Sequence, residues 1–180
     1  MTFLAPLLRL PEKTLQVLGR AMREVEYVHS SGRGRNAHRL THLEVARILI
    51  AVMVSESTTT GVERLPHFAA LPLKAKSNQN TTFEVAFAHL LKRYAEGEAR
   101  TWYVEIDIGM SEAKIGTQLW EEGFGHEEHV FGLDFDDEDF KLASDDYPLP
   151  YLCSIQRKSL IHGSTLKAIS RRVFADGEVN

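Results

Sequence analysis

The chain has 180 residues, of which 43% are hydrophobic and 26% charged, with a formal net charge of −4. This balance is typical of a folded protein with an ordinary surface, and no apolar run approaches the roughly 18 to 20 residues that cross a bilayer. The single cysteine, Cys153, excludes an intramolecular disulfide and an all-cysteine metal site, and favours a reducing, cytoplasmic setting. The N-terminal MTFLAPLLRLPEK lacks a basic start and a small-residue cleavage site, so we interpret it as structure and not as a signal peptide.

Charge is unevenly distributed along the chain. Residues 1–50 hold eight Lys/Arg and four Asp/Glu, whereas residues 51–180 hold thirteen and twenty-one. A basic first third followed by an acidic remainder favours a protein that presents one face to a polyanion such as nucleic acid. A chance asymmetry of the surface is the alternative interpretation.

The first periodic segment runs from Pro11 to Glu24, after a short helix expected at about residues 2–9. Proline suits the first turn of a helix, where its missing N–H is not needed. At about 100° per residue, one face of the helix is apolar and is formed by Leu15, Leu18, Met22 and Val25. The opposite, polar face is formed by Lys13, Gln16, Arg20 and Arg23.

A hairpin is expected directly after this helix. Residues 25–30 are rich in β-formers, residues 31–34 (Ser-Gly-Arg-Gly) are typical of a turn, and residues 35–40 can return as a second strand. Two glycines and the arginines Arg33 and Arg35 therefore lie at or beside the predicted tip.

Two capping boxes predict the starts of later helices. Thr41 and Glu44 open a helix to about Ser55 that is apolar nearly all round, as in a buried central helix. Residues 56–80 are expected to be a connection with one short helical piece at about residues 62–70. Thr81 and Glu84 form the second box, which opens a helix to about Glu96, with Gly97 ending it.

The last third predicts strands and one more helix. Alternating apolar residues favour a strand at 101–108, and further strands are expected at 113–120, 128–135 and 151–160, with a helix at 164–174. Residues 121–146 hold eleven Asp/Glu and one Lys, so we expect a solvated acidic loop there. Together these elements predict an α+β fold, in which a small antiparallel sheet with helices is packed on or linked to the N-terminal unit.

The order of basic-faced helix, Gly/Arg hairpin and buried helix resembles the winged helix-turn-helix. In particular, the stretch EYVHSSGRGRNAHRLTHLEVARILIAV (26–52) is similar to a segment of phage- and prophage-encoded bacterial proteins, in which a helix–wing unit precedes an α+β domain. The resemblance covers the first third of the chain well and the rest in outline. It implies a DNA-binding regulator and not an enzyme.

The resemblance also implies roles for particular residues. In a winged helix, the recognition helix enters the major groove, and the wing places Arg or Lys on the backbone or in the minor groove. The residues expected to contact DNA are, on the helix, Lys13, Thr14, Gln16, Val17, Arg20 and Arg23, and in the wing Arg33, Arg35 and Arg39.

The sequence hypothesis is thus a sequence-specific transcriptional regulator that binds double-stranded DNA as a homodimer. Residues 1–56 would form the winged-helix-like DNA-binding unit, residues 57–80 the connection, and residues 81–180 an α+β domain for dimerisation or partner binding. We expect no catalytic residues, metal or cofactor, because no nucleophile elbow, phosphate loop, calcium loop or zinc motif is present.

Two alternatives remain open at this stage. The acidic region 121–146 is compatible with a protein-interaction module, such as a phage-encoded inhibitor of a host machine that mimics nucleic acid. Asp107 with Glu112 and Lys114 resembles the acidic pair and lysine of some metal-dependent nucleases, although charges beside a predicted turn are also ordinary surface residues.

Overall fold

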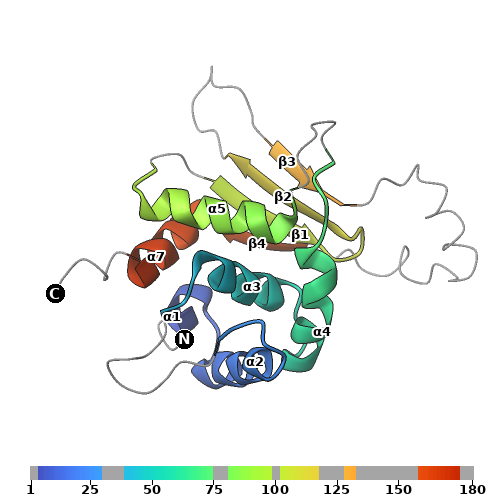
Figure 1. Ribbon diagram of the computed structural model, residues 1–180, viewed down its shortest axis with the longest axis vertical. Helices are drawn as coiled ribbons and strands as arrows, with labels where there is room; N and C mark the ends of the chain where they lie inside the picture. Colours follow the sequence, from blue (N-terminus) through green and yellow to red (C-terminus); the bar gives the residue numbers. More distant parts are fainter. Residues whose placement is uncertain are drawn as a thin grey trace, which may run out of the picture.

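Helices and one antiparallel sheet make up the computed structural model, which confirms the α+β class (Figure 1). The structure describes residues 4–29, 39–74, 81–98, 102–117, 128–132 and 158–174. The helices within these ranges are α1 (Leu4–Leu8), α2 (Glu12–Glu24), α3 (His42–Met53), α4 (Thr58–Ala69), α5 (Phe83–Ala95) and α7 (Gly163–Phe174). None of these helices has the length and apolar character that crossing a membrane requires.

Helix α2 confirms the predicted amphipathic segment. Pro11 is its N-cap, and its apolar face buries Leu15, Leu18 and Met22. Val25 was expected on the same face, but it is 49% exposed, because the helix ends at Glu24 and Val25 is the C-cap. The apolar face of α2 packs on α4 and, less extensively, on the short helix α1.

Residues 25–29, expected to be the first strand of the hairpin, form turns and a bend instead. Glu26 lies in the left-handed region with φ +61°, and the N–H of Tyr27 bonds back to the carbonyl of Met22. The chain therefore leaves α2 by coiling back on its last turn, which is incompatible with an extended strand at this position. The predicted tip, residues 31–34, and most of the return strand lie outside the described residues.

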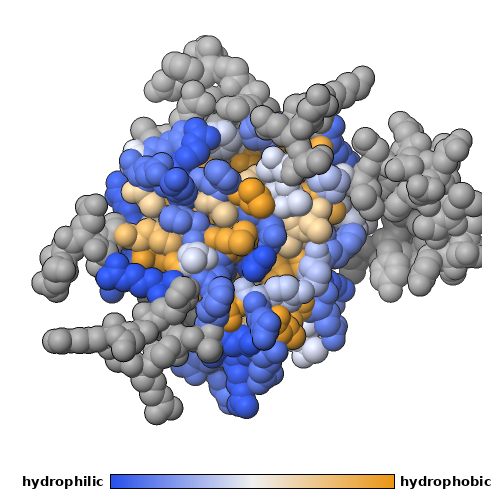
Figure 2. All heavy atoms as spheres, viewed as in Figure 1, coloured by the Kyte–Doolittle hydropathy of each residue, from blue (hydrophilic) through white to orange (hydrophobic). Residues whose placement is uncertain are grey.

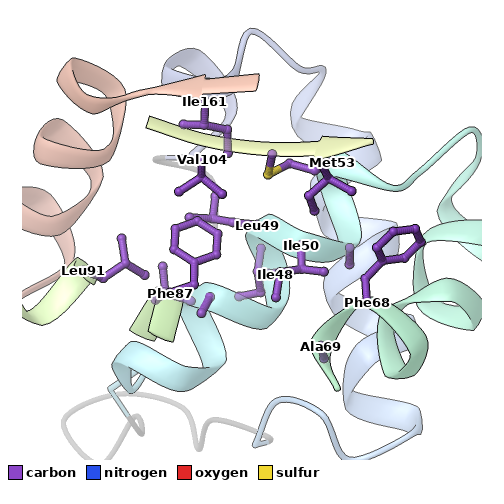
Figure 3. Packing of buried hydrophobic residues seen from close by; sticks show 14 of the residues in the cluster. Ile48, Leu49, Ile50, Met53, Phe68, Ala69, Phe87, Leu91, Val104 and Ile161 are labelled. Carbon is purple, nitrogen blue, oxygen red and sulfur yellow. The ribbon is translucent and has the colours of Figure 1, made fainter. Parts of the chain in front are cut away.

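Helix α3 is the centre of the fold. The predicted capping box is confirmed, since the Thr41 side chain accepts from the N–H of Glu44 and the Glu44 side chain accepts from the N–H of Thr41. From Val45 onward nearly every side chain is buried. Figure 3 shows that Ile50 meets Phe68 of α4, whereas Leu49 lies toward Phe87 of α5 and the sheet. The apolar character all round α3 follows from this position. Helix α4 packs on one side of it, and α5 and the sheet lie on the other.

Glu44 is a buried carboxylate that joins two parts of the chain. Its side chain is 3% exposed. One oxygen accepts from the backbone N–H of His29 at 2.7 Å and lies 2.9 Å from His29 Nδ1, and the other accepts from the N–H and hydroxyl of Thr41 at 2.7 and 2.9 Å. Burial alone would raise the pKa of Glu44, but these hydrogen bonds outweigh it and lower the pKa to about 2.

Helix α4 is longer than the short helical piece predicted at residues 62–70. It begins at Thr58 because Ser57 and Thr60 form a reciprocal capping box that the sequence reading missed. Gly61 is required by the tight turn between α3 and α4, since a Cβ there would lie 2.7 Å from the carbonyl oxygen of Ala51. Arg64 closes the same turn by bonding to the carbonyl of Val54 and to Glu56.

Helix α5 begins without the predicted capping box. Its N-cap is Thr82, one residue later than expected, and the Thr82 side chain makes no cap hydrogen bond. Glu84 instead bonds to Arg47 of α3 at 2.8 Å, with both side chains a quarter exposed or less. The end of α5 confirms the prediction: Gly97 has φ +94°, and its N–H and that of Glu98 bond to the last carbonyls of the helix.

The sheet has the strand order β3-β2-β1-β4, with every neighbouring pair antiparallel. The strands are β1 (Trp102–Asp107), β2 (Glu112–Thr117), β3 (Glu128–Phe131) and β4 (Lys158–His162). The predicted alternation in β1 is confirmed, since Trp102, Val104 and Ile106 are buried against the helices. The register opposes Val104 to Ile115 on one side and to Ile161 on the other.

One cluster of buried apolar residues runs through the described chain, from Leu4 in α1 to Ile169 in α7. Helix α7 packs on α5, β1 and β4, and α1 packs on α7. Beyond α3, at the end of the molecule away from the sheet, lies α2 (Figure 1). The division at residues 56 and 80 stays a prediction.

Glu44→Gln tests how much the buried carboxylate stabilises the fold. We expect this change to lower the free energy of unfolding at about pH 7 by up to about 3 kcal/mol, because one unit of pKa shift corresponds to about 1.4 kcal/mol. The folded pKa is about 2 and the ordinary value 4.5. The stabilisation is therefore complete above about pH 5 and is lost as the pH falls toward about 2. Urea denaturation of both proteins at several pH values measures this difference.

The matched control is Glu84→Gln, which also removes a first-turn glutamate, here from α5, where the carboxylate accepts from the Arg47 side chain. We expect a smaller loss. A difference between wild type and Glu44→Gln that stays constant from pH 7 to pH 3 would contradict the role given to Glu44.

Candidate nucleic-acid interface

The polar side of α2 is the surface on which the structure brings the predicted site residues together. Lys13, Gln16, Val17, Arg20 and Arg23 are all exposed, and their spacing of three or four residues places them along one side of the helix. Thr14 is half-buried beside them. In the space-filling view, hydrophilic residues dominate the end of the molecule where α2 lies (Figure 2).

Carboxylates on the same helix already bind two of these side chains. Gln16 Nε2 donates to Glu12 at 2.8 Å, and Arg20 Nε lies 3.1 Å from Glu24. The Arg20 and Glu24 side chains are 80% and 64% exposed. An exposed pair of this kind contributes only about 0.3–0.5 kcal/mol, so it presents little obstacle to a phosphate that competes for the arginine.

Val17 is the one apolar member of this surface. It is 46% exposed, in the middle of the polar side of α2. A single exposed valine is ordinary on a protein surface and carries no argument alone. On a helix seated in a DNA groove, such a side chain has the size to contact a thymine methyl group.

The predicted wing residues are less completely described. Arg39 is exposed and lies two residues before the N-cap of α3. Arg33 and Arg35 lie outside the described residues. Glu44 fixes both ends of the segment that contains them, since it binds His29 on one side and Thr41 on the other. The sequence reading identified Glu44 only as a capping residue, because nothing local in the pattern shows that His29 returns to it.

The predicted nuclease group, Asp107, Glu112 and Lys114, has other partners. Asp107 accepts from the N–H of Met110 at 3.1 Å, which closes the β1–β2 turn, and lies 3.5 Å from Lys158. Glu112 is bound by Lys74 at 3.1 Å and by Lys114 at 3.4 Å. Each carboxylate therefore already faces a lysine ammonium group.

Within the described ranges, no three His, Cys, Asp or Glu side chains are placed to hold a metal ion. Burial would lower the pKa of Lys114, but Glu128 and Glu112 outweigh it and raise that pKa. Lys114 is thus held as a cation that neutralises its neighbours. On this face of the sheet, the positive charges of the lysines offset the negative charges of the neighbouring carboxylates.

Comparison with protein families, with curated proteins and with solved structures gives no match for this chain. The assignment of a function therefore depends on the geometry and chemistry of its own surfaces.

Proposed function

We propose that the chain is a DNA-binding regulator. It would contact a duplex with the polar side of α2 and with residues 30–40, called here the Gly-Arg segment. The observation that carries the proposal is the division of α2 into two sides. Its leucines and methionine are buried on the core, while Lys13, Gln16, Arg20 and Arg23 face solvent together. A rigid helix that presents cationic and amide side chains at this spacing has the donors that phosphates and base edges accept.

The Gly-Arg segment supports the proposal through its attachment. His29 lies five residues after the end of α2, and Thr41 is the N-cap of α3. Glu44 accepts hydrogen bonds from both residues. Arg33 and Arg35 belong to the stretch of chain between these two anchor points, nine and eleven residues after the end of α2. The proposed fold for this unit is a winged-helix-like arrangement in which α2 is the recognition helix and residues 30–40 take the role of the wing.

The proposed assembly is a homodimer, since helix-turn-helix proteins bind paired half-sites about one helical turn apart. A phage or prophage origin follows only from the resemblance of residues 26–52. The protein-interaction alternative relies on the acidic residues 121–146, nearly all of which lie outside the described residues.

Fluorescence anisotropy with mixed-sequence duplex DNA tests the proposal directly. Tight, salt-sensitive binding supports it, since each phosphate contact adds about −0.9 to the slope of log K against log salt. Absence of binding at low salt would refute it and favour the protein-interaction module.

The double variant Arg33→Ala, Arg35→Ala tests the tethered segment. We expect weaker binding to every duplex and a salt slope reduced by about one per lost phosphate contact. A control on another surface is Arg171→Ala, which removes one positive charge, against two in the double variant, from an exposed position of α7 and should have less than half the effect of the double variant. If the double variant binds as the wild type does while α2 variants do not, the wing role is wrong.

Single changes on α2 test the recognition helix. We expect Arg20→Ala or Gln16→Ala to change the preference among duplex sequences, since a base contact is worth about 1–3 kcal/mol of discrimination. Selection of bound sequences from a randomised duplex pool measures this preference for each variant. A uniform loss of affinity across sequences would show that these residues contact only the phosphate backbone of the DNA and not its bases.

Glu24→Gln offers a gain-of-function test on the same surface. Its carboxylate holds Arg20 at 3.1 Å, so its removal frees the guanidinium and removes a repulsive charge. We expect DNA affinity to rise roughly twofold, the equivalent of a lost pair of about 0.3–0.5 kcal/mol. Anisotropy at low salt measures the rise, and weaker binding by Glu24→Gln would count against α2 as the contact surface.

A further inference from the structure

A groove of about 310 Å³ opens between α5 and the β2–β3 side of the sheet. Val85, His89 and Arg93 line it from α5, and Trp102, His129 and Phe131 line it from the sheet. The three α5 residues are spaced by four, so they form one stripe along the helix. This volume is at the small end of the range for sites that bind metabolites and other small molecules.

The groove exists because the sheet extends beyond the helices that cover it. Helix α7 packs on β1 and β4, at the opposite side of the sheet. The register places Ile115 opposite His129 on the helix-facing side of β2 and β3. Along the outer edge of β3, Lys74 donates to the carbonyl of Val130 at 2.8 Å, which closes that side of the groove with the chain before α5.

One residue of the groove lining, Trp102, carries an unsatisfied hydrogen-bond donor. Trp102 is 1% exposed, and its indole Nε1–H is buried with no hydrogen-bond partner among the residues that the structure describes. The rest of the residue is firmly held, because its backbone N–H donates to the hydroxyl of Tyr94 at 2.7 Å. Buried N–H groups almost always have an acceptor, so a fixed indole without one suggests that the acceptor belongs to another molecule.

The charge and shape of the lining indicate which molecule. Arg93 lies over the Trp102 ring, with its Cζ 5.2 Å from the centroid, and the imidazole of His129 is nearly parallel to that ring at 12°. Glu98 fixes the guanidinium of Arg93 at 2.6 Å and offsets part of its charge, whereas the Arg93 side chain stays 49% exposed. Among the described residues that line the groove, none is acidic, whereas arginine and histidine both occur.

We propose that this groove binds a small planar aromatic carboxylate. The ring lies against the aromatic and apolar walls, and the carboxylate accepts from the Trp102 indole N–H beside Arg93 and His89. Stacked planar groups and a charge-assisted hydrogen bond together give both shape and charge selectivity. The site does not depend on the proposed DNA binding, and each is tested separately.

Isothermal titration of the full chain with 2-naphthoate, and with the neutral 2-naphthamide, tests the proposal. We expect naphthoate to bind measurably at millimolar concentration or below and the amide to bind at least several-fold more weakly. Trp102→Phe keeps an aromatic ring but loses the N–H, and should weaken naphthoate binding roughly tenfold or more, as for a lost hydrogen bond to a charged acceptor. Thermal unfolding of each variant reports whether it folds.

A second variant keeps the test decisive if Trp102→Phe fails to fold. Val85 is 38% exposed at the groove, so Val85→Glu adds a repelling carboxylate without disturbing the core, and should abolish measurable naphthoate binding. Lys92→Gln is the control, because it makes the same change in net charge at an exposed α5 position outside the groove and should leave binding unchanged. No binding by the wild type, equal binding of amide and carboxylate, or unchanged binding by Val85→Glu would overturn the proposal.

Discussion

The burial of α3 on nearly all sides is the constraint on which the rest of the structure depends. A helix with so little solvated surface must have its terminal polar groups satisfied largely by the protein itself. At the N-terminus, Glu44 and Thr41 satisfy each other and draw His29 into the same network. At the C-terminus, Ser159 of β4 donates to the carbonyl of Met53 at 2.6 Å, and Arg64 of α4 donates to that of Val54. The two ends of one helix thereby join the N-terminal helices to the sheet.

Features set by neighbouring residues could be predicted from the sequence, and features set by distant partners could not. The Thr41–Glu44 box, the two sides of α2 and the alternation in β1 all follow from local spacing, and the structure confirms them. The Thr81–Glu84 box has the same spacing, yet it does not form, because Glu84 pairs with Arg47, 37 residues away. The sequence did not predict the groove beside Trp102 either, since its walls come from α5 and from β1, β2 and β3.

The two charged surfaces differ in how their charges are compensated. On the outer face of the sheet, Lys158 pairs with Glu105 and Asp107, and Lys114 with Glu112 and Glu128, so cations and carboxylates lie side by side on fixed strands. On α2 the pairing is exposed and weak, and Lys13 and Arg23 project from the same helix. A polyanion would gain more from α2, where little has to be displaced. This difference separates the surface proposed to bind DNA from the sheet face that carries Asp107, Glu112 and Lys114.

The network around Glu44 has a consequence for how this sequence can be altered. A single carboxylate, that of Glu44, binds the chain at His29 and at Thr41. The core should therefore be little affected by the sequence and length of the residues between these two points. Lengthening the chain between two anchored points costs only about 0.6 kcal/mol for each doubling of its length when that chain is flexible. The position is therefore suited to insertions, deletions and grafted peptides, and is one at which selection could diversify what the protein recognises while leaving the scaffold intact.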